Sequence, residues 1–267
     1  MRYHGYEAEV TVPEGVSRIA RDAFRRRKNL VRGLILSEGV AEMEEAALAG
    51  LPELNSVTLP GSLRTVPKRA FSGCGALRQL RMAEGVEDIG AEAFSDCRCL
   101  DRIAFPGSLR AIGRDAFLRT KWADDAPEGP LFAGPVLFLY KGDCPPETEL
   151  RPGTAAVACS AFSNQMNLRH ITLPDTLTHI GDAAFWYCFA LRDLTLPEGL
   201  THIGSCAFSG CESLRDVTIP DSVVSIGDLA FDCIPGLILH GRKGSPAERY
   251  AWKHGLAFAE APGTGRP

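Results

Sequence analysis

Cysteine and histidine are the residue types in this chain whose spacing could support chemistry, either as zinc ligands or as disulfides. The 267 residues include nine cysteines and six histidines. His202 and Cys206 are four residues apart, which is close to zinc-ligand spacing, and His179 stands 23 residues before His202. Disulfides would require an oxidising compartment, and an odd number of cysteines leaves at least one thiol unpaired. Both readings therefore depend on where the fold places these side chains.

Motifs of known catalytic and cofactor sites are missing from the sequence. The chain contains no G-x-S-x-G, no P-loop, no H-E-x-x-H, no C-x-x-C and no dinucleotide-binding fingerprint. The nearest glycine pair, Gly73 and Gly75, is predicted to be a turn. We therefore predict no catalytic residue, no cofactor and no metal, and we expect that the protein is not an enzyme.

The elements that would position any site are set by an internal repeat of 23 residues. The steps between equivalent positions are 24, 23, 23, 23, 45, 23, 23 and 23 residues. A unit of this length cannot bury its own apolar face, so the units are expected to stack as a solenoid. The equivalent positions, called ladder positions below, are Phe24, Leu48, Phe71, Phe94, Phe117, Phe162, Phe185, Phe208 and Phe231.

One unit shows how each coil is expected to form. Leu194 and Leu196 alternate with polar residues, which predicts a half-buried strand. Pro197 ends this strand because proline has no N–H to donate to a sheet. Ile203 and Phe208 then return to the core, the second of them on a short helical turn. The strand is expected to pair in parallel with the same strand of the next coil.

The repeated motif resembles the BspA-like leucine-rich repeat family over residues 8–258. The resemblance implies a right-handed leucine-rich-repeat solenoid, an α/β repeat with a parallel β-sheet on one face and short helical turns between strands. It also implies a binding or scaffolding role, since some members of the family are secreted bacterial adhesins. The second unit departs from the motif at Met43, Glu44 and Leu48, and the third departs at Pro67. The stretches that carry the resemblance are Ile171–Pro174, Ile180–Cys188 and Ile203–Cys211.

In this register most cysteines have structural explanations. Cys159 and Cys206 fall in columns that otherwise hold mainly polar residues, so we expect them to be exposed. Stacked coils lie within reach of a disulfide, but we favour reduced thiols. Four others form an inward column three residues after a ladder position, where a thiol packs as a small hydrophobic group: Cys74, Cys97, Cys188 and Cys211.

The domain prediction is a single solenoid over residues 1–258. At its end, Ser245 is the expected N-cap of a helix, with Glu248 completing a capping box and Gly255 ending the helix. This helical cap would cover the last coil, and residues 259–267 are predicted to be a disordered tail. The expected segments are repeats at about 8–117 and 148–240, an insertion at 118–150 and the cap at 241–258.

The insertion is the main irregularity. Two apolar runs flank Ala133-Gly134-Pro135, which predicts a β-hairpin. Two interpretations are open: the hairpin packs onto the solenoid in place of a missing coil, or it presents aromatic side chains to a partner. The residues that would anchor such an interface are Trp122, Phe132, Phe138 and Tyr140.

Composition excludes several classes of protein. The formal net charge of −4 comes from 29 basic and 33 acidic residues that are well mixed. This balance does not predict the basic face that nucleic-acid binding requires. There is no run of 18 apolar residues, so membrane insertion is not expected. The first six residues lack the apolar core of a signal peptide, which favours a cytoplasmic protein. The alternative is a cell-surface or secreted protein exported by a non-standard route.

Outward-facing strand residues of the last three units form the candidate binding face. Earlier units place Gln79, Arg81 and Arg102 at such positions, so the face is expected to be basic there and acidic toward the C-terminus. The candidate residues form three columns: His170, Asp193 and Asp216; Thr172, Thr195 and Thr218; and Asp175, Glu198 and Asp221.

These patterns predict a non-enzymatic scaffold whose sheet face binds an unknown partner protein. The alternatives are an adhesin that binds host or cell-surface proteins and, more distantly, an enzyme of unknown class. Two explanations are open for the aspartate column, since like charges on neighbouring strands repel. The face binds a basic protein segment, with a divalent cation as a lesser option, or it is neutralised by the arginines one residue earlier in each coil: Arg169, Arg192 and Arg215.

Overall fold

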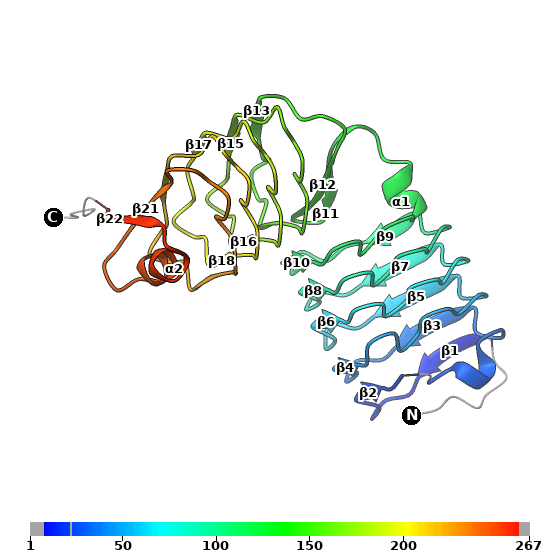
Figure 1. Ribbon diagram of the computed structural model, residues 1–267. Helices are drawn as coiled ribbons and strands as arrows, with labels where there is room; N and C mark the ends of the chain where they lie inside the picture. Colours follow the sequence, from blue (N-terminus) through cyan, green and yellow to red (C-terminus); the bar gives the residue numbers. More distant parts are fainter. Residues whose placement is uncertain (1–7, 22, 262–267) are drawn as a thin grey trace. The chain divides into compact units, whose positions relative to one another are not determined.

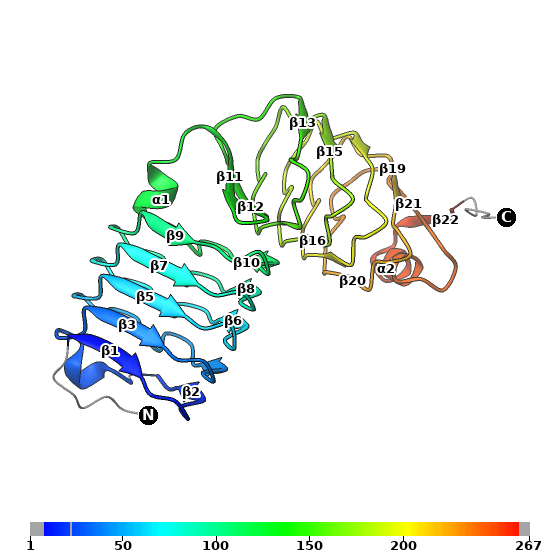
Figure 2. The same ribbon diagram turned by 180° about the vertical axis from the view of Figure 1, so that it is seen from behind.

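The structure is a computed structural model that describes residues 8–21 and 23–261 (Figures 1 and 2). The chain divides into two compact units, residues 1–127 and 128–267, called the N-terminal and C-terminal units below. Both are solenoids built from parallel strands, as the repeat predicts. None of the helices in the described ranges has the length and apolarity that a bilayer crossing needs.

In the N-terminal unit each coil contributes a longer strand and a two-residue strand. The longer strands form the sheet β1-β3-β5-β7-β9, and the short strands form β10-β8-β6 and β2-β4. The helical segments are η1 (Arg25–Arg27) and α1 (Lys121–Asp124). The strands are β1 (Glu9–Val12), β2 (Arg18–Ile19), β3 (Gly33–Leu36), β4 (Glu42–Met43), β5 (Ser56–Leu59), β6 (Thr65–Val66), β7 (Gln79–Met82), β8 (Asp88–Ile89), β9 (Arg102–Ala104) and β10 (Ala111–Ile112).

The C-terminal unit repeats this plan after a hairpin and ends in a helix, α2 (Pro246–His254). Its sheets run β11-β12-β14-β16-β18-β20, β13-β15-β17 and β19-β21-β22. The strands are β11 (Gly129–Ala133), β12 (Val136–Lys141), β13 (Glu147–Glu149), β14 (Ala156–Val157), β15 (His170–Thr172), β16 (His179–Ile180), β17 (Asp193–Leu194), β18 (His202–Ile203), β19 (Asp216–Thr218), β20 (Ser225–Ile226), β21 (Ile238–Gly241) and β22 (Ala257–Glu260).

The short strands are a difference from the expected pattern of one sheet with helical turns. Leu200 and Ile203 were expected only to return to the core, yet His202 and Ile203 pair in parallel with Ser225 and Ile226. Tight turns then carry the chain past the later ladder positions, whereas the helical segment η1 follows the first one, Phe24. Each coil contributes only two residues to this second sheet, which is too short a run to show the alternation of apolar and polar residues that predicts a strand. The second sheet therefore forms where neighbouring coils stack.

Seven of the eight ladder phenylalanines form a buried stack within their unit, as predicted, and Phe24 is separated from the others by Leu48. Phe71, Phe94 and Phe117 stack at centroid distances of 5.2 and 5.3 Å. Phe162, Phe185, Phe208 and Phe231 stack at 5.1, 5.1 and 5.2 Å in the other unit. All seven rings are fully buried. Offset stacking of this kind adds to the stabilisation that comes from removing the rings from water.

The inward cysteine column is also present, and each thiol has a defined role. Burial raises the pKa of the Cys74 thiol to about 11, so it stays protonated and can donate. Each Sγ of the column lies 3.1–3.2 Å from the carbonyl oxygen of the ladder residue in the preceding coil. For Cys97, that residue is Phe71. All nine cysteines are free thiols in the described residues. The expected exposure of Cys159 and Cys206 is wrong, because both side chains are half-buried.

The insertion does contain the expected β-hairpin, but its second strand is a coil of the solenoid. β11 and β12 are antiparallel, while β12 pairs in parallel with β14. Tyr140 donates its backbone N–H to Ala161 O at 2.8 Å, and its ring lies 5.5 Å from that of Phe162. Phe162 N bonds to Ala184 O in the same way. Tyr140 therefore takes a ladder position one coil before Phe162.

The C-terminal cap follows the predicted pattern closely. Ser245 Oγ accepts from Glu248 N at 3.4 Å, while Glu248 Oε2 accepts from Gly244 N at 2.6 Å. Gly255 ends the helix with a φ of 67°. The Tyr250 hydroxyl accepts a hydrogen bond from the Phe231 N–H at 3.1 Å. In earlier coils the N–H of the ladder residue donates instead to a backbone carbonyl of the next coil. β22 extends two residues into the predicted tail, and residues 262–267 lie outside the described residues.

Replacing Tyr250 by phenylalanine tests this cap. The change leaves the buried Phe231 N–H without its acceptor, so we expect the free energy of unfolding to fall by about 1–3 kcal/mol. Tyr187→Phe is the matched control, since the Tyr187 hydroxyl has no hydrogen-bond partner among the described residues. Chemical denaturation of both variants measures the difference. Equal stability of the two would show that the hydroxyl of Tyr250 does not terminate the array.

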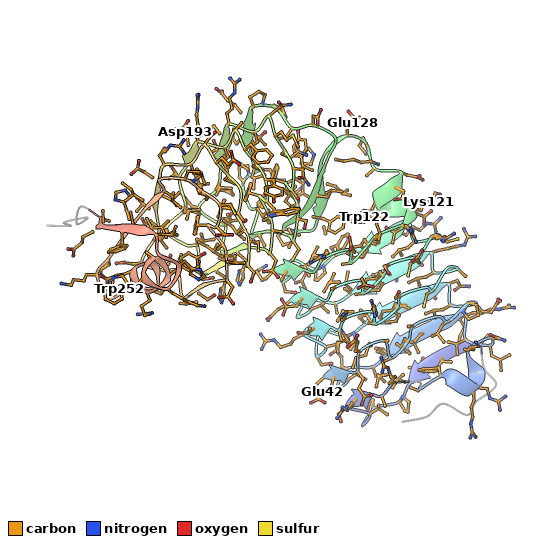
Figure 3. All side chains as sticks on the ribbon, in the orientation of Figure 1. Glu42, Lys121, Trp122, Glu128, Asp193 and Trp252 are labelled. Carbon is orange, nitrogen blue, oxygen red and sulfur yellow. The ribbon has the colours of Figure 1, made fainter. Side chains whose placement is uncertain are left out.

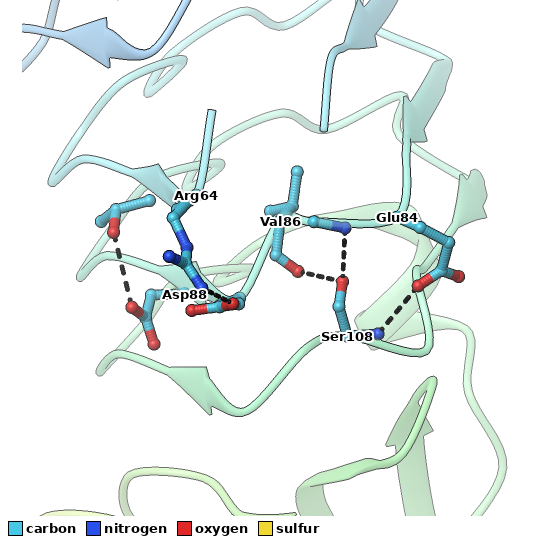
Figure 4. Close-up of polar contacts among 8 residues, drawn as sticks. Arg64, Glu84, Val86, Asp88 and Ser108 are labelled. Carbon is cyan, nitrogen blue, oxygen red and sulfur yellow. Dashed lines mark hydrogen bonds and ion pairs between the residues drawn. The ribbon is translucent and has the colours of Figure 1, made fainter. Parts of the chain in front are cut away.

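The turns that follow the longer strands lock coils together in pairs (Figure 4). The Glu84 carboxylate accepts from Gly107 N at 2.8 Å and from Ser108 N at 3.0 Å. Ser108 Oγ accepts from Gly85 N at 2.9 Å and donates to Val86 O at 2.7 Å. The same four bonds join the turns of Glu38 and Ser62. In the other unit the hydroxyl-to-carbonyl bond recurs from Thr176 to Thr154, at 2.8 Å, and from Ser222 to Leu200, at 2.6 Å.

Candidate binding surface

The first candidate column lies on the outer face of sheet β13-β15-β17. Glu147 pairs with His170, and His170 pairs with Asp193. The alternate residues Ile171 and Leu194 are buried, so the column faces solvent. Asp216 has the equivalent place on β19, although β17 and β19 are not hydrogen-bonded as neighbours and belong to separate sheets. The structure therefore adds Glu147 at the start of the column.

The two aspartates have different charge partners. Asp193 Oδ2 lies 3.2 Å from Arg192 Nε, with both side chains more than 60% exposed (Figure 3). Asp216 Oδ1 lies 2.8 Å from His240 Nε2 on β21. Arg215 instead donates to two backbone carbonyls, those of Glu212 and Leu214, at 2.6 and 2.8 Å. Neutralisation by arginine thus applies to Asp193 and not to Asp216, and exposed pairs of this kind contribute at most about 1 kcal/mol.

The second column is lined by hydroxyl groups. Thr172, Thr195 and Thr218 are all exposed. Glu149 pairs with Thr172 at the start of the column, and Thr218 pairs with His240 near its end. Together the two columns form a strip of carboxylates and hydroxyls that could accept hydrogen bonds from basic side chains. We call the strip the acidic face; it contains Glu147, His170, Asp193, Asp216, Glu149, Thr172, Thr195 and Thr218.

The third column lies in the turns after these strands. Asp175, Glu198 and Asp221 are exposed, and Asp221 Oδ1 lies 3.5 Å from Arg242 Nε. These residues occupy the same turn position as Glu84, but no bond from the Glu198 carboxylate to the neighbouring turn is present among the described residues. The turn carboxylates of this unit therefore add negative charge beside the acidic face.

The corresponding face of the N-terminal unit contains the two expected arginines, Arg81 and Arg102, together with the exposed Glu9. Gln79 on β7 pairs with Arg102 on β9, and Arg81 pairs with Ala104. Both arginines are exposed. Ile35, which is 49% exposed, lies in the same column as Arg81, between Thr11 and Thr58. The two units thus present outer sheet faces of different chemical character.

The aromatic residues predicted as an interaction hairpin belong to three elements, α1, β11 and β12. Trp122 belongs to helix α1, where its ring centroid lies 5.1 Å from that of Phe117 and 5.2 Å from that of Phe105. Tyr140 packs on Phe162 as described above, and Phe138 is half-buried on the same strand. The Arg151 guanidinium lies 3.8 Å above the Phe132 ring. Phe132 and Tyr140 line a pocket of about 340 Å³ together with Pro130, Thr148, Glu149, Leu150, Arg151 and Pro152.

Of the residues that suggested a metal site, the two histidines are neighbours in the second sheet, whereas Cys206 lies in the turn that follows β18. His179 pairs with His202, and their rings stack at 4.5 Å with an interplanar angle of 6°. Each Nδ1 lies 2.8 Å from the threonine hydroxyl just before it in the chain, Thr178 or Thr201. No group of three or more possible metal ligands occurs in the part of the chain that the structure describes.

One partly exposed aromatic cluster was missed by the sequence reasoning. Trp186, Tyr187 and Phe189 follow the buried ladder residue Phe185, and their rings stack in chain order at 4.2 and 5.3 Å. Three aromatic residues within four positions were visible in the sequence, but they were aligned only as part of the repeat motif. The same positions of the neighbouring coil hold Ser209, Gly210 and Glu212.

Comparison with known proteins identifies the repeat. A family model for the BspA type leucine-rich repeat region matches residues 4–122 and 148–237 in six copies. A search of curated proteins finds no match. The similar solved structures include a leucine-rich cell surface protein from Faecalibacterium prausnitzii, which is 20% identical, with 99% of this chain and 90% of that chain covered and a TM-score of 0.45. A leucine-rich repeat protein from Bacteroides ovatus is 22% identical, with 94% and 77% covered and a TM-score of 0.40. The pneumococcal vaccine antigen PcpA is 15% identical, with 98% and 91% covered and a TM-score of 0.40.

Proposed function

Because the chain belongs to the BspA-type leucine-rich repeat family, we propose that it is a non-catalytic scaffold whose acidic face binds a basic segment of a partner protein. The observation that carries this proposal is the uninterrupted outward column Glu147, His170 and Asp193, flanked by exposed threonines. A parallel sheet presents such columns at fixed spacing, so an extended segment can place its basic side chains against them.

The electrostatics of the face support a cationic partner. Asp193 and Asp216 keep more than 60% of their side-chain surface exposed even where Arg192 and His240 contact them. Glu147, Glu149, Asp175 and Glu198 have no ion-pair partner among the described residues. Complementary charge of this kind raises association rates and gives specificity, and its effect falls with ionic strength.

Replacing both strand aspartates by asparagine tests the proposal. With the intact chain as bait, we expect Asp193→Asn combined with Asp216→Asn to reduce capture of its partner at least tenfold. Stability should stay within about 1 kcal/mol of the parent because only exposed pairs are lost. Quantitative mass spectrometry of captured proteins and thermal unfolding measure the two effects.

A charge-matched control separates the face from net charge. Glu53→Gln combined with Asp125→Asn removes two exposed carboxylates from the N-terminal unit and should leave capture unchanged. Equal capture by all three proteins, or a stability loss with capture intact, would refute the acidic face as the binding surface. Fractionation of the producing cells separates the two settings for this proposal, an intracellular scaffold and a surface adhesin that uses the same face.

A further inference from the structure

The stacked rings of Trp186, Tyr187 and Phe189, which we call the aromatic ridge, form a partly exposed cluster on a single coil, in which Trp186 is exposed and Tyr187 and Phe189 are half-buried. The indole of Trp186 is 36% exposed. Tyr187 is the middle ring, 4.2 Å from Trp186 and 5.3 Å from Phe189 between centroids, with interplanar angles of 25° and 16°. In the preceding coil, the position equivalent to Phe189 holds Met166, which is 58% exposed.

The repeat does not need these side chains. The core of this coil is already filled by Phe185, Cys188 and Leu191, which are fully buried. Neighbouring coils fold with Ser163 or Ser209 in the position of Trp186. Large exposed aromatic residues that the core does not use are typical of binding surfaces, since they supply much contact area at a low cost in conformational entropy.

The next coil is adapted to the ridge. Gly210 has a φ of +76°, and a Cβ atom there would lie 2.1 Å from Tyr187 Cδ1. Any side chain at this position would therefore displace the tyrosine ring. Asn164 and Tyr187 occupy the equivalent position in the two preceding coils and also have a positive φ. The backbone conformation alone therefore does not require glycine at position 210. Gly210 lets the tyrosine lie against the backbone and holds the three rings together.

The exposed positions of the following coils that correspond to ridge positions carry negative charge. Glu212 and Asp232 occupy exposed positions in the two following coils that correspond to those of Phe189 and Trp186. Asp182, three residues before Phe185, is exposed as well. In the C-terminal unit, the four positions after each ladder phenylalanine contain no lysine or arginine, as read from residues 163–166, 186–189, 209–212 and 232–235.

From this geometry we infer that the aromatic ridge is a second contact for the same basic partner segment, and that it takes one bulky apolar side chain flanked by lysine or arginine. The inference rests on the proposed function. Phe189 precedes Asp193 by only four residues in the same coil, so one extended segment can reach both surfaces. The acidic face then supplies charge complementarity, and the ridge supplies an apolar anchor site.

Synthetic peptides test the ridge separately from the acidic face. The probes are a short peptide of alternating lysine and serine with leucine at its centre, and the same peptide with serine at its centre. We expect the full-length protein to bind the leucine peptide about tenfold more tightly, because a leucine side chain is removed from water. Trp186→Ser combined with Phe189→Gly should reduce this ratio to about one. Trp252→Ser, which removes a tryptophan that is 86% exposed on α2, should preserve it (Figure 3).

The outcomes distinguish the two proposals. Asp193→Asn with Asp216→Asn should weaken binding of both peptides and keep their ratio. If those changes have no effect while the ratio still depends on Trp186, the acidic face is wrong and the ridge stands. If the parent protein does not discriminate between the peptides, or the ridge variant still does, the ridge is refuted. Binding of a chitin oligomer that depends on Trp186, without peptide discrimination, would overturn the inference in favour of a glycan.

Discussion

Replacing Phe185 by alanine is expected to lower the free energy of unfolding of the C-terminal unit by about 3–5 kcal/mol. The ring is fully buried and stacks at 5.1 Å on both Phe162 and Phe208. Its removal leaves a cavity that two neighbouring coils must line, and their backbones are held by hydrogen bonds to the adjacent coils. Thermal and denaturant unfolding of the variant and the parent measure the effect.

Two controls make the test specific. Trp252→Ala removes a larger aromatic side chain from an exposed position and should change stability by less than about 0.5 kcal/mol. Phe24→Ala should cost less than Phe185→Ala, because the next ladder position holds Leu48 and not a second ring. An unchanged midpoint for Phe185→Ala would show that the stacked rings do not hold the solenoid together.

Replacing Gly204 by alanine is expected to cost about 1–3 kcal/mol, although it adds a single methyl group. A Cβ atom at Gly204 would lie 2.5 Å from Asp182 N and Gly181 C, which are backbone atoms of the preceding coil. The coils would have to separate locally, and the backbone bond from Gly204 N to Ile180 O at 2.8 Å would weaken. Differential scanning calorimetry should therefore show a lower midpoint.

Gly75 provides the matched control for this change. A Cβ atom there would meet no atom within 4 Å, and its φ lies outside the left-handed region. Gly75→Ala is therefore expected to be neutral or slightly stabilising. If both glycine variants behave alike, close approach of the coils is not what selects glycine at position 204.

The repeat period was sufficient to predict most of the fold. Because side chains in a strand alternate between faces, Leu194 and Leu196 indicated which residues point inward, and the ladder phenylalanines indicated the stacking direction. The cap was predictable for a different reason, since Ser245, Glu248 and Gly255 each have a local role at a helix end. The departure at Glu44 has a structural reason: its carboxylate accepts from Arg21 N at 2.7 Å and pairs with Arg18 at 2.8 Å.

The features that the sequence could not predict involve residues whose spacing departs from the 23-residue period. Tyr140 was not aligned as a ladder residue because it is a tyrosine that precedes Phe162 by 22 residues rather than 23. His240 was missed for the same reason, since it pairs with Thr218 across a step of 22 residues. Its contact with Asp216 depends on that register.

The paired turns have a consequence for how the gene of such an array grows. The serine or threonine hydroxyl that reaches back to the preceding turn occurs in alternate coils, at Ser62 and Ser108 and again at Thr176 and Ser222. Each of these two pairs is separated by 46 residues, which is two coils. The inheritable module is therefore a doublet. Duplication or deletion of 46 residues preserves the alternation between turns that carry this hydroxyl and turns that do not. A change of 23 residues would place two turns of the same kind next to each other. Natural length variants and designed extensions should accordingly differ by even numbers of coils.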